Sequence, residues 1–277
     1  MKRKIAIVGA TGGLGREISL QFAQKGADLI FLGRSQNKMK FLADEINLKF
    51  ADCKIDFVEI DLTEMDSVKT ACDTLEKMTF DTIVLNAGIY NVPRFVTSTG
   101  FENIFQVNFV SQYYIACRML EKFKKQKGGH IVAVGSVAYN YSKSDFEDID
   151  FKTRKKPSKV YGNSKRFLMF SLYKLFENEK DVKLSIVHPG VTLTQMTNHY
   201  PKFINWLVKI GIKIFFPSPK AACRSIVQGA WDCCESFEWI GPRIFTVWGK
   251  PKKQKIKRCE DEANRVFEIA NSIVKKL

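Results

Sequence analysis

Short apolar runs alternate with helical patterns along most of this chain. The predicted strands span residues 5–8, 29–32, 57–60, 82–85, 130–134 and 183–187. The predicted helices between them span residues 14–24, 37–50, 64–76, 101–126 and 159–178. Strands that are apolar along their whole length are typical of a parallel sheet covered by helices on both faces. The sequence therefore predicts a doubly wound α/β fold, in which ligands bind beyond the carboxyl ends of the strands.

The composition is that of an ordinary globular domain. Of the 277 residues, 45% are hydrophobic and 26% are charged, and no internal repeat is visible, so we expect one domain over residues 1–277. The apolar run at the start ends at Val8, too early for a signal core. Residues 203–216 are also apolar but include Lys209 and Lys213, and a spanning helix needs about 20 apolar residues. A cytoplasmic location is expected.

The cysteines and histidines give no sign of a metal site. The seven cysteines form no Cys-x-x-Cys pair, and the chain has only three histidines. We therefore expect reduced thiols, with neither a disulfide framework nor a bound metal.

The net charge of +15 favours anionic partners. The densest basic run lies near the C-terminus and contains Lys250, Lys252, Lys253, Lys255, Lys257 and Arg258. Contact with a polyanion is one interpretation of this run. We favour a solvated loop and expect no nucleic-acid partner, because no aromatic residues are interleaved with the charges and no nucleic-acid motif accompanies them.

A glycine-rich turn follows the first predicted strand and opens the first predicted helix. Its sequence is Gly9-Ala-Thr-Gly-Gly-Leu-Gly15. Glycines allow a tight turn and a close backbone approach, and a helix N-terminus offers free N–H groups to a phosphate. We expect the turn to bind the pyrophosphate of a dinucleotide. The candidate binding residues are Gly9, Thr11, Gly12, Gly13, Leu14 and Gly15.

The spacing of these glycines resembles the TGxxxGxG fingerprint of the short-chain dehydrogenase/reductase family, with Val8 in place of the usual threonine. The resemblance implies a Rossmann-type fold, a nicotinamide cofactor and oxidoreductase activity. Gly9, Gly12 and Gly15 also fit the GxxGxxG of the extended branch of the same superfamily, whose members work on nucleotide sugars.

The end of the second predicted strand bears on which cofactor binds. Sites selective for NAD place a carboxylate there, whereas this chain has Gly33 followed by Arg34. A guanidinium binds a 2′-phosphate with two hydrogen bonds, so NADP(H) is preferred over NAD(H); a cap on a surface loop is the less favoured role for Arg34. The resemblance adds adenine-side contacts from Asp61 and Leu62 and a further cofactor contact from the triplet Asn86, Ala87 and Gly88.

A tyrosine and a lysine four residues apart carry the predicted chemistry. Tyr161 and Lys165 lie on one face of a predicted helix, where a nearby ammonium and a cationic nicotinamide ring would favour the phenolate. In the family these positions are catalytic, and the resemblance makes Tyr161 the proton donor and acceptor. It makes Ser136 the group that orients the substrate oxygen. Asn108 would hold a water beside the lysine, although a kink inside the helix is the alternative role for Asn108.

The segment after the sixth predicted strand resembles the family's Pro-Gly motif. Pro189, Gly190, Val191 and Thr194 are the candidate cofactor contacts there, and the threonine would bind the nicotinamide carboxamide. His188 precedes the proline at a strand end, which favours a structural role over a catalytic one.

Two further segments bear on the branch and the substrate. An insertion at residues 139–159 and the segment His188-Pro189-Gly190 resemble retinol-dehydrogenase-type enzymes. Residues 195–217 are rich in aromatic and aliphatic side chains and are expected to form an apolar substrate lid. They imply a lipophilic ketone, aldehyde or alcohol as substrate. A peripheral membrane contact through residues 203–216 is the competing interpretation, because lysines flank the apolar face.

Other hypotheses stay open at this point. The chain could be a non-catalytic NADP(H)-binding sensor or an extended-branch enzyme acting on a nucleotide sugar. The resemblance also allows a homodimer or a homotetramer, and residues 263–274 are expected to form an amphipathic helix that packs on the sheet or on a second subunit.

Overall fold

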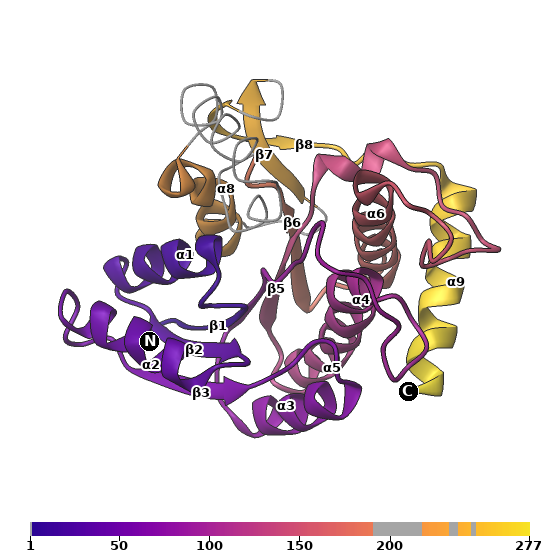
Figure 1. Ribbon diagram of the computed structural model, residues 1–277. Coiled ribbons are helices and arrows are strands. Elements are labelled where there is room, and N and C mark those ends of the chain that lie inside the picture. Colours follow the sequence, from indigo (N-terminus) through magenta and orange to yellow (C-terminus); the bar gives the residue numbers. More distant parts are fainter. Residues whose placement is uncertain (1, 191–217, 233–237, 245–247) are drawn as a thin grey trace, which may run out of the picture.

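The computed structural model describes residues 2–190, 218–232, 238–244 and 248–277. Within them, strands form one sheet in the order β3-β2-β1-β4-β5-β6-β7-β8 (Figure 1). The strands are β1 (Lys4–Val8), β2 (Asp28–Gly33), β3 (Ile55–Glu59), β4 (Thr82–Leu85), β5 (Gly129–Val134), β6 (Val182–Val187), β7 (Glu238–Ile244) and β8 (Trp248–Gln254). All neighbouring pairs are parallel except β7 with β8, which confirms the predicted α/β sheet.

Helices cover both faces of this sheet (Figure 1). One layer contains α1 (Gly13–Gln24), α2 (Gln36–Asn47) and α8 (Pro219–Trp231), whose buried side chains share one core cluster. The other layer contains α3 (Met65–Lys77), α5 (Ser111–Lys125), α6 (Pro157–Leu175) and α9 (Glu260–Lys276), which share a second cluster. Because the strands are apolar on both faces, each face requires such a cover.

The strand order places the ligand site. The chain moves outward from β1 to β2 and β3, and it then returns to pair β4 with the other side of β1. The order therefore reverses between β1 and β4, and ligands bind at such a reversal beyond the carboxyl ends of the strands. Two of the predicted cofactor segments, the glycine turn and the triplet at 86–88, follow β1 and β4 directly.

We expected the basic run near the C-terminus to be a solvated loop, but its first part is a strand. Lys250, Lys252 and Lys253 belong to β8, which pairs antiparallel with β7 and forms one edge of the sheet. Strand β8 is hydrogen-bonded to β7 on one side only. Lysines on such an edge strand discourage its unpaired side from pairing with a strand of another chain. Residues 250–253 are three lysines and one proline, so no run of apolar residues marked this strand in the sequence.

The long helix expected at 101–126 is present over residues 103–125, with one π-helical segment inside it. A short α4 (Asn103–Phe105) leads into the π-helix η1 (Gln106–Val110), and α5 begins only at Ser111. Single π-turns inside helices occur often at functional sites, and this one contains Asn108. The C-terminal helix is present as α9 and packs against α6 (Figure 1).

Two searches of the described residues bear on classes of protein. No helix among them is long and apolar enough to cross a membrane. No group of three or more His, Cys, Asp or Glu side chains in the same residues could hold a metal ion. The predicted lid at 195–217 lies outside the described residues, as do Val191 and Thr194.

Candidate active site

The glycine turn folds tightly onto the end of β4. Gly9 has φ 78°, and a Cβ atom at this position would lie 3.0 Å from the Cβ of Ala87. A Cβ on Gly15 would lie 2.0 Å from the Gly9 carbonyl oxygen, a distance that no real contact allows. Glycine is therefore required at both positions. The turn joins the start of α1 and the end of β4 into one surface.

The N-terminus of α1 is open to a ligand. Gly12 is the N-cap residue and no side chain caps the helix, so the first-turn N–H groups of Gly13, Leu14 and Gly15 suit an anion such as a pyrophosphate. Thr11 lies beside the end of β2, with its hydroxyl oxygen 3.8 Å from where a Cβ of Gly33 would be.

Asn86 supports the turn from β4 and offers one free atom. Its Nδ2 donates to the Gly9 carbonyl at 3.2 Å. Its Oδ1 is buried and has no hydrogen-bond partner among the described residues. A buried acceptor without a donor is costly, so the site suits a bound group that donates there. The glycine cradle and this atom together fit a dinucleotide.

Arg34 and Asp61 come together at the ends of β2 and β3. The Arg34 guanidinium lies 3.7 Å from Asp61 Oδ2, and 72% of the Arg34 side chain is exposed. Asp61 Oδ1 accepts hydrogen bonds from the backbone and hydroxyl of Thr63. Leu62 is buried, and its carbonyl accepts from Ser111 at 2.6 Å. The hydrogen bonds from Thr63 hold the Asp61 carboxylate in place. The Arg34 guanidinium is largely exposed and can therefore be reached by an anion.

A cavity lies between α1 and α2. Its volume is about 280 Å³, and its lining includes Thr11 together with the cations Arg16 and Lys38. Arg16 is ion-paired with Glu45, which also lines the cavity. Two basic side chains and one acidic side chain therefore line the space between α1 and α2.

Tyr161 and Ser136 are brought together by α6 and the end of β5. Ser136 is the N-cap residue of the short helix η2 (Val137–Tyr141), and its hydroxyl accepts from Ala138 N at 3.2 Å. Burial raises the pKa of Tyr161 to about 12, and a hydrogen bond with Ser136 opposes that rise. The phenol is consequently protonated at neutral pH, which suits a proton donor.

Lys165 is buried beneath Tyr161. Its Nζ lies 6.0 Å from the centre of the Tyr161 ring and donates to the Val134 carbonyl at 2.8 Å. Burial lowers the pKa of Lys165 to about 8. We expected the ammonium to lower the pKa of Tyr161, but in the protein without cofactor that pKa is raised, and burial is the largest cause.

Asn108 connects the loop after β4 to α6, the helix that contains Tyr161 and Lys165. Its Oδ1 accepts from Ile89 N at 2.8 Å, and its Nδ2 donates to Ser164 Oγ at 3.1 Å. Ser164 Oγ in turn donates to the Tyr161 carbonyl at 2.8 Å. A Cβ on Gly88 would lie 3.5 Å from Asn108 Oδ1 and 3.6 Å from Lys165 Nζ, so these groups converge on one point.

Tyr90 is a site residue that the sequence analysis missed. Its ring packs edge-to-face on Tyr161, with the centroids 5.3 Å apart and an interplanar angle of 84°. It follows the Asn86-Ala87-Gly88 triplet by two residues, and an aromatic residue at that place was the available signal. Ser164 was also missed, although it lies inside the segment between Tyr161 and Lys165.

The segment after β6 is described only as far as Gly190. Gly190 has φ 83°, a conformation that favours glycine, and Pro189 is buried. The His188 ring is buried and stacks on Trp239 at 5.5 Å, with its backbone N–H donating to Ile240. Its placement agrees with the structural role predicted for it.

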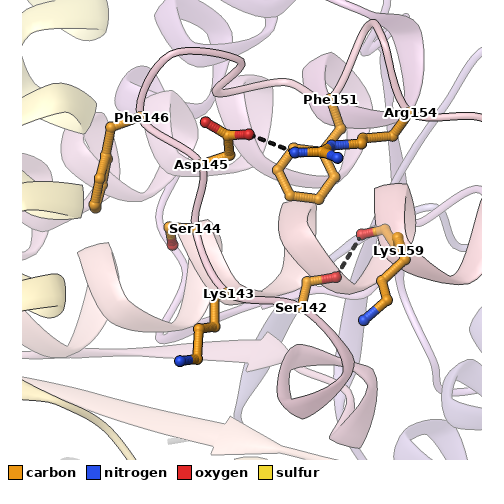
Figure 2. Close-up of a pocket in the computed structure, with 8 residues that line it drawn as sticks. All are labelled: Ser142, Lys143, Ser144, Asp145, Phe146, Phe151, Arg154 and Lys159. Carbon is orange, nitrogen blue, oxygen red and sulfur yellow. Dashed lines mark hydrogen bonds and ion pairs between the residues drawn. The ribbon is translucent and has the colours of Figure 1, made fainter.

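The insertion at 139–159 encloses a second cavity of about 410 Å³ (Figure 2). Asp145 pairs with Arg154 across it, and the Ser142 hydroxyl donates to the Lys159 carbonyl. None of the four predicted catalytic residues lines this cavity. The insertion is therefore a folded structure with its own hydrogen bonds.

The family can now be stated. The short chain dehydrogenase family matches residues 3–204, and the chain belongs to it. It is of the retinol-dehydrogenase-like branch of this oxidoreductase family.

Curated relatives match most of the chain. Retinol dehydrogenase 13 of Mus musculus is 24% identical over 94% of this chain and 79% of its own length. The Homo sapiens protein of the same name is 26% identical over 71% of this chain, and the match spans only 61% of that protein. Polyprenol dehydrogenase of Homo sapiens is 26% identical over 89% of this chain and 75% of its own length.

Solved structures share the fold. A crystal structure of an uncharacterized protein from Mycobacterium Paratuberculosis superposes with a TM-score of 0.79 at 21% identity, covering 99% of this chain and 93% of that one. A short-chain dehydrogenase from Sphingobium yanoikuyae in complex with NADPH gives a TM-score of 0.64 at 22% identity, covering 84% and 86%.

Proposed function

We propose that this protein interconverts a lipophilic ketone or aldehyde and the corresponding alcohol, with NADP(H) as its cofactor. The observation that carries the proposal is the convergence of the Tyr161 phenol, the Ser136 hydroxyl and the Lys165 ammonium next to the glycine turn. A protein that only senses its cofactor has no use for such a set of proton donors.

The proposed roles follow from the positions of these groups. The bound nicotinamide supplies or accepts the hydride. In reduction, Tyr161 donates its phenolic proton to the substrate oxygen, and Ser136, hydrogen-bonded to the phenol, orients that oxygen. In the proposal Lys165, whose Nζ lies 6.0 Å from the centre of the Tyr161 ring, returns a proton toward Tyr161. Asn108 holds the loop after β4 against the catalytic helix, and its part in a water-mediated proton relay stays a prediction.

The preference for NADP(H) is supported by the charges at the end of β2. Arg34 is exposed, its guanidinium lies 3.7 Å from Asp61, and Arg16 and Lys38 line a cavity between α1 and α2. In Arg34→Leu we expect the KM for NADPH to rise about 10- to 100-fold, because a hydrogen bond to a charged group contributes about 1.5–3 kcal/mol. The KM for NADH should change less than threefold.

The matched control is Arg265→Leu on the exposed side of α9, which should leave both KM values unchanged. Initial rates with each cofactor give the comparison. Equal losses for NADPH and NADH in Arg34→Leu would contradict the proposed contact with the 2′-phosphate.

The substrate class is supported by the apolar composition of residues 195–217 and by the similarity to retinol dehydrogenase 13 and polyprenol dehydrogenase. NADPH oxidation should be measured with all-trans-retinal, decanal and a bulky aryl ketone, and turnover of at least one is expected. Turnover of UDP-glucose derivatives alone would favour the extended-branch alternative. Tight NADPH binding without turnover of any carbonyl would favour the sensor.

A further inference from the structure

The residue that follows the catalytic lysine makes an unusually complete set of hydrogen bonds. Arg166 Nε and Nη2 donate to the two carboxylate oxygens of Glu262 at 2.6 and 2.5 Å. Its Nη1 donates to the Tyr139 carbonyl at 2.9 Å. Only 9% of Arg166 is exposed. A bidentate pair of this kind fixes both distance and orientation, which a single contact does not.

Glu262 joins this pair to a third segment. Its Oε1 also accepts from the Ser144 backbone N–H at 2.9 Å, in the insertion whose cavity Figure 2 shows. Burial alone would raise the pKa of Glu262, but the hydrogen bonds from Arg166 and Ser144 lower it to about 2. The carboxylate is therefore charged at every working pH.

The network reaches the predicted catalytic groups on two sides. Arg166 adjoins Lys165 on α6 and lies five residues after Tyr161. Tyr139, whose carbonyl it binds, belongs to η2, the short helix that Ser136 caps. A Cβ on Gly162 would lie 2.4 Å from the Ala138 carbonyl oxygen, so α6 and η2 are packed as closely as backbone allows.

The C-terminal helix is the outer anchor of this arrangement. Glu262 lies in the first turn of α9, which packs along α6 (Figure 1). The family match covers residues 3–204, and α9 lies after it. Lys257, just before α9, also donates its backbone N–H to the Tyr139 hydroxyl at 3.0 Å.

We propose that Glu262 is a positioning residue, which acts through Arg166 to hold Tyr161 on α6 and Ser136 at η2 in register for proton transfer. This inference rests on the proposed function. The C-terminal helix is then a working part of the active site and more than a cover for the sheet.

The test compares Glu262→Gln, Arg166→Lys and the double variant. Each single change breaks the bidentate pair while keeping a side chain of similar size. We expect kcat with the best carbonyl of the panel to fall about 10- to 50-fold, whereas the Kd for NADPH, measured by fluorescence, stays within twofold. The double variant should be no slower than the slower single variant, because both changes remove one interaction. Glu268→Gln, an exposed position on the same helix, should match the wild type.

Amide hydrogen exchange gives a readout that needs no substrate. In Glu262→Gln the amides of residues 136–141 and 158–168 should exchange at least 10-fold faster, whereas those of α1 should not change. Unchanged exchange, an unchanged kcat, additive losses in the double variant, or a loss of NADPH binding equal to the loss of kcat would each overturn the positioning role. A wild type that reduces no carbonyl would overturn the proposed function instead, and the exchange result would still decide the role of Glu262.

Discussion

Tyr161→Phe should lower kcat by about 10²- to 10⁴-fold, the range that positioned acid–base groups contribute. The change removes only the phenolic hydroxyl, which hydrogen-bonds with Ser136 and carries the proton that the carbonyl oxygen needs. The ring and its edge-to-face contact with Tyr90 remain, so the fold should be unaffected. The Kd for NADPH should stay within a few-fold of the wild-type value, because the phosphate seat lies at the other end of the site. Steady-state rates and a fluorescence titration measure the two quantities.

Tyr114→Phe is the matched control. This residue lies on α5, and its hydroxyl accepts from Arg118 at 3.1 Å, away from the site. The control should turn over at the wild-type rate. A Tyr161→Phe enzyme with rates near the wild-type value would exclude Tyr161 as proton donor.

Lys165→Met should abolish turnover and stabilise the protein without cofactor. Burial lowers the pKa of Lys165 from 10.5 to about 8, which corresponds to a cost of about 3 kcal/mol for keeping the ammonium in the folded state. Methionine has a similar length and carries no charge. The lost hydrogen bond to Val134 offsets about 1 kcal/mol, so the free energy of unfolding should rise by about 2 kcal/mol at pH 7. Differential scanning calorimetry should show an increase of a few degrees in Tm.

The pH dependence of the free energy of unfolding tests whether the buried charge of Lys165 is the cause of this stabilisation. Between pH 8 and 10.5 the unfolded wild type binds a proton at Lys165 that the folded protein has released, so wild-type stability gains from rising pH in this window. The advantage of Lys165→Met should therefore be full below pH 8 and shrink above it. Lys122→Met replaces a partly buried lysine that donates to the Met78 carbonyl, and this control should retain turnover. A destabilised Lys165→Met, or a pH-independent difference, would contradict the argument.

Much of the fold could be predicted because its signals are local. The strands from β1 to β6 are mostly apolar, although β3 and β6 also contain charged residues, and the helices between them have one apolar face, so each element is visible in a short window. Strands β7 and β8 were not predicted. Strand β8 contains four charged or proline residues in a row at 250–253, and its strand conformation depends on hydrogen bonds with the neighbouring strand β7. Local apolar periodicity does not detect a strand of this composition.

The candidate site divides in the same way. The sequence by itself determined the glycine turn, the four-residue spacing of Tyr161 and Lys165, and the placement of each motif after a strand, because these depend on backbone geometry over a few residues. Only the tertiary structure decided that burial raises the pKa of Tyr161, and that Arg166 is bound by Glu262 from a helix almost 100 residues away. Burial and long-range ion pairs arise from segments that meet only on folding, and no short window of sequence contains both partners.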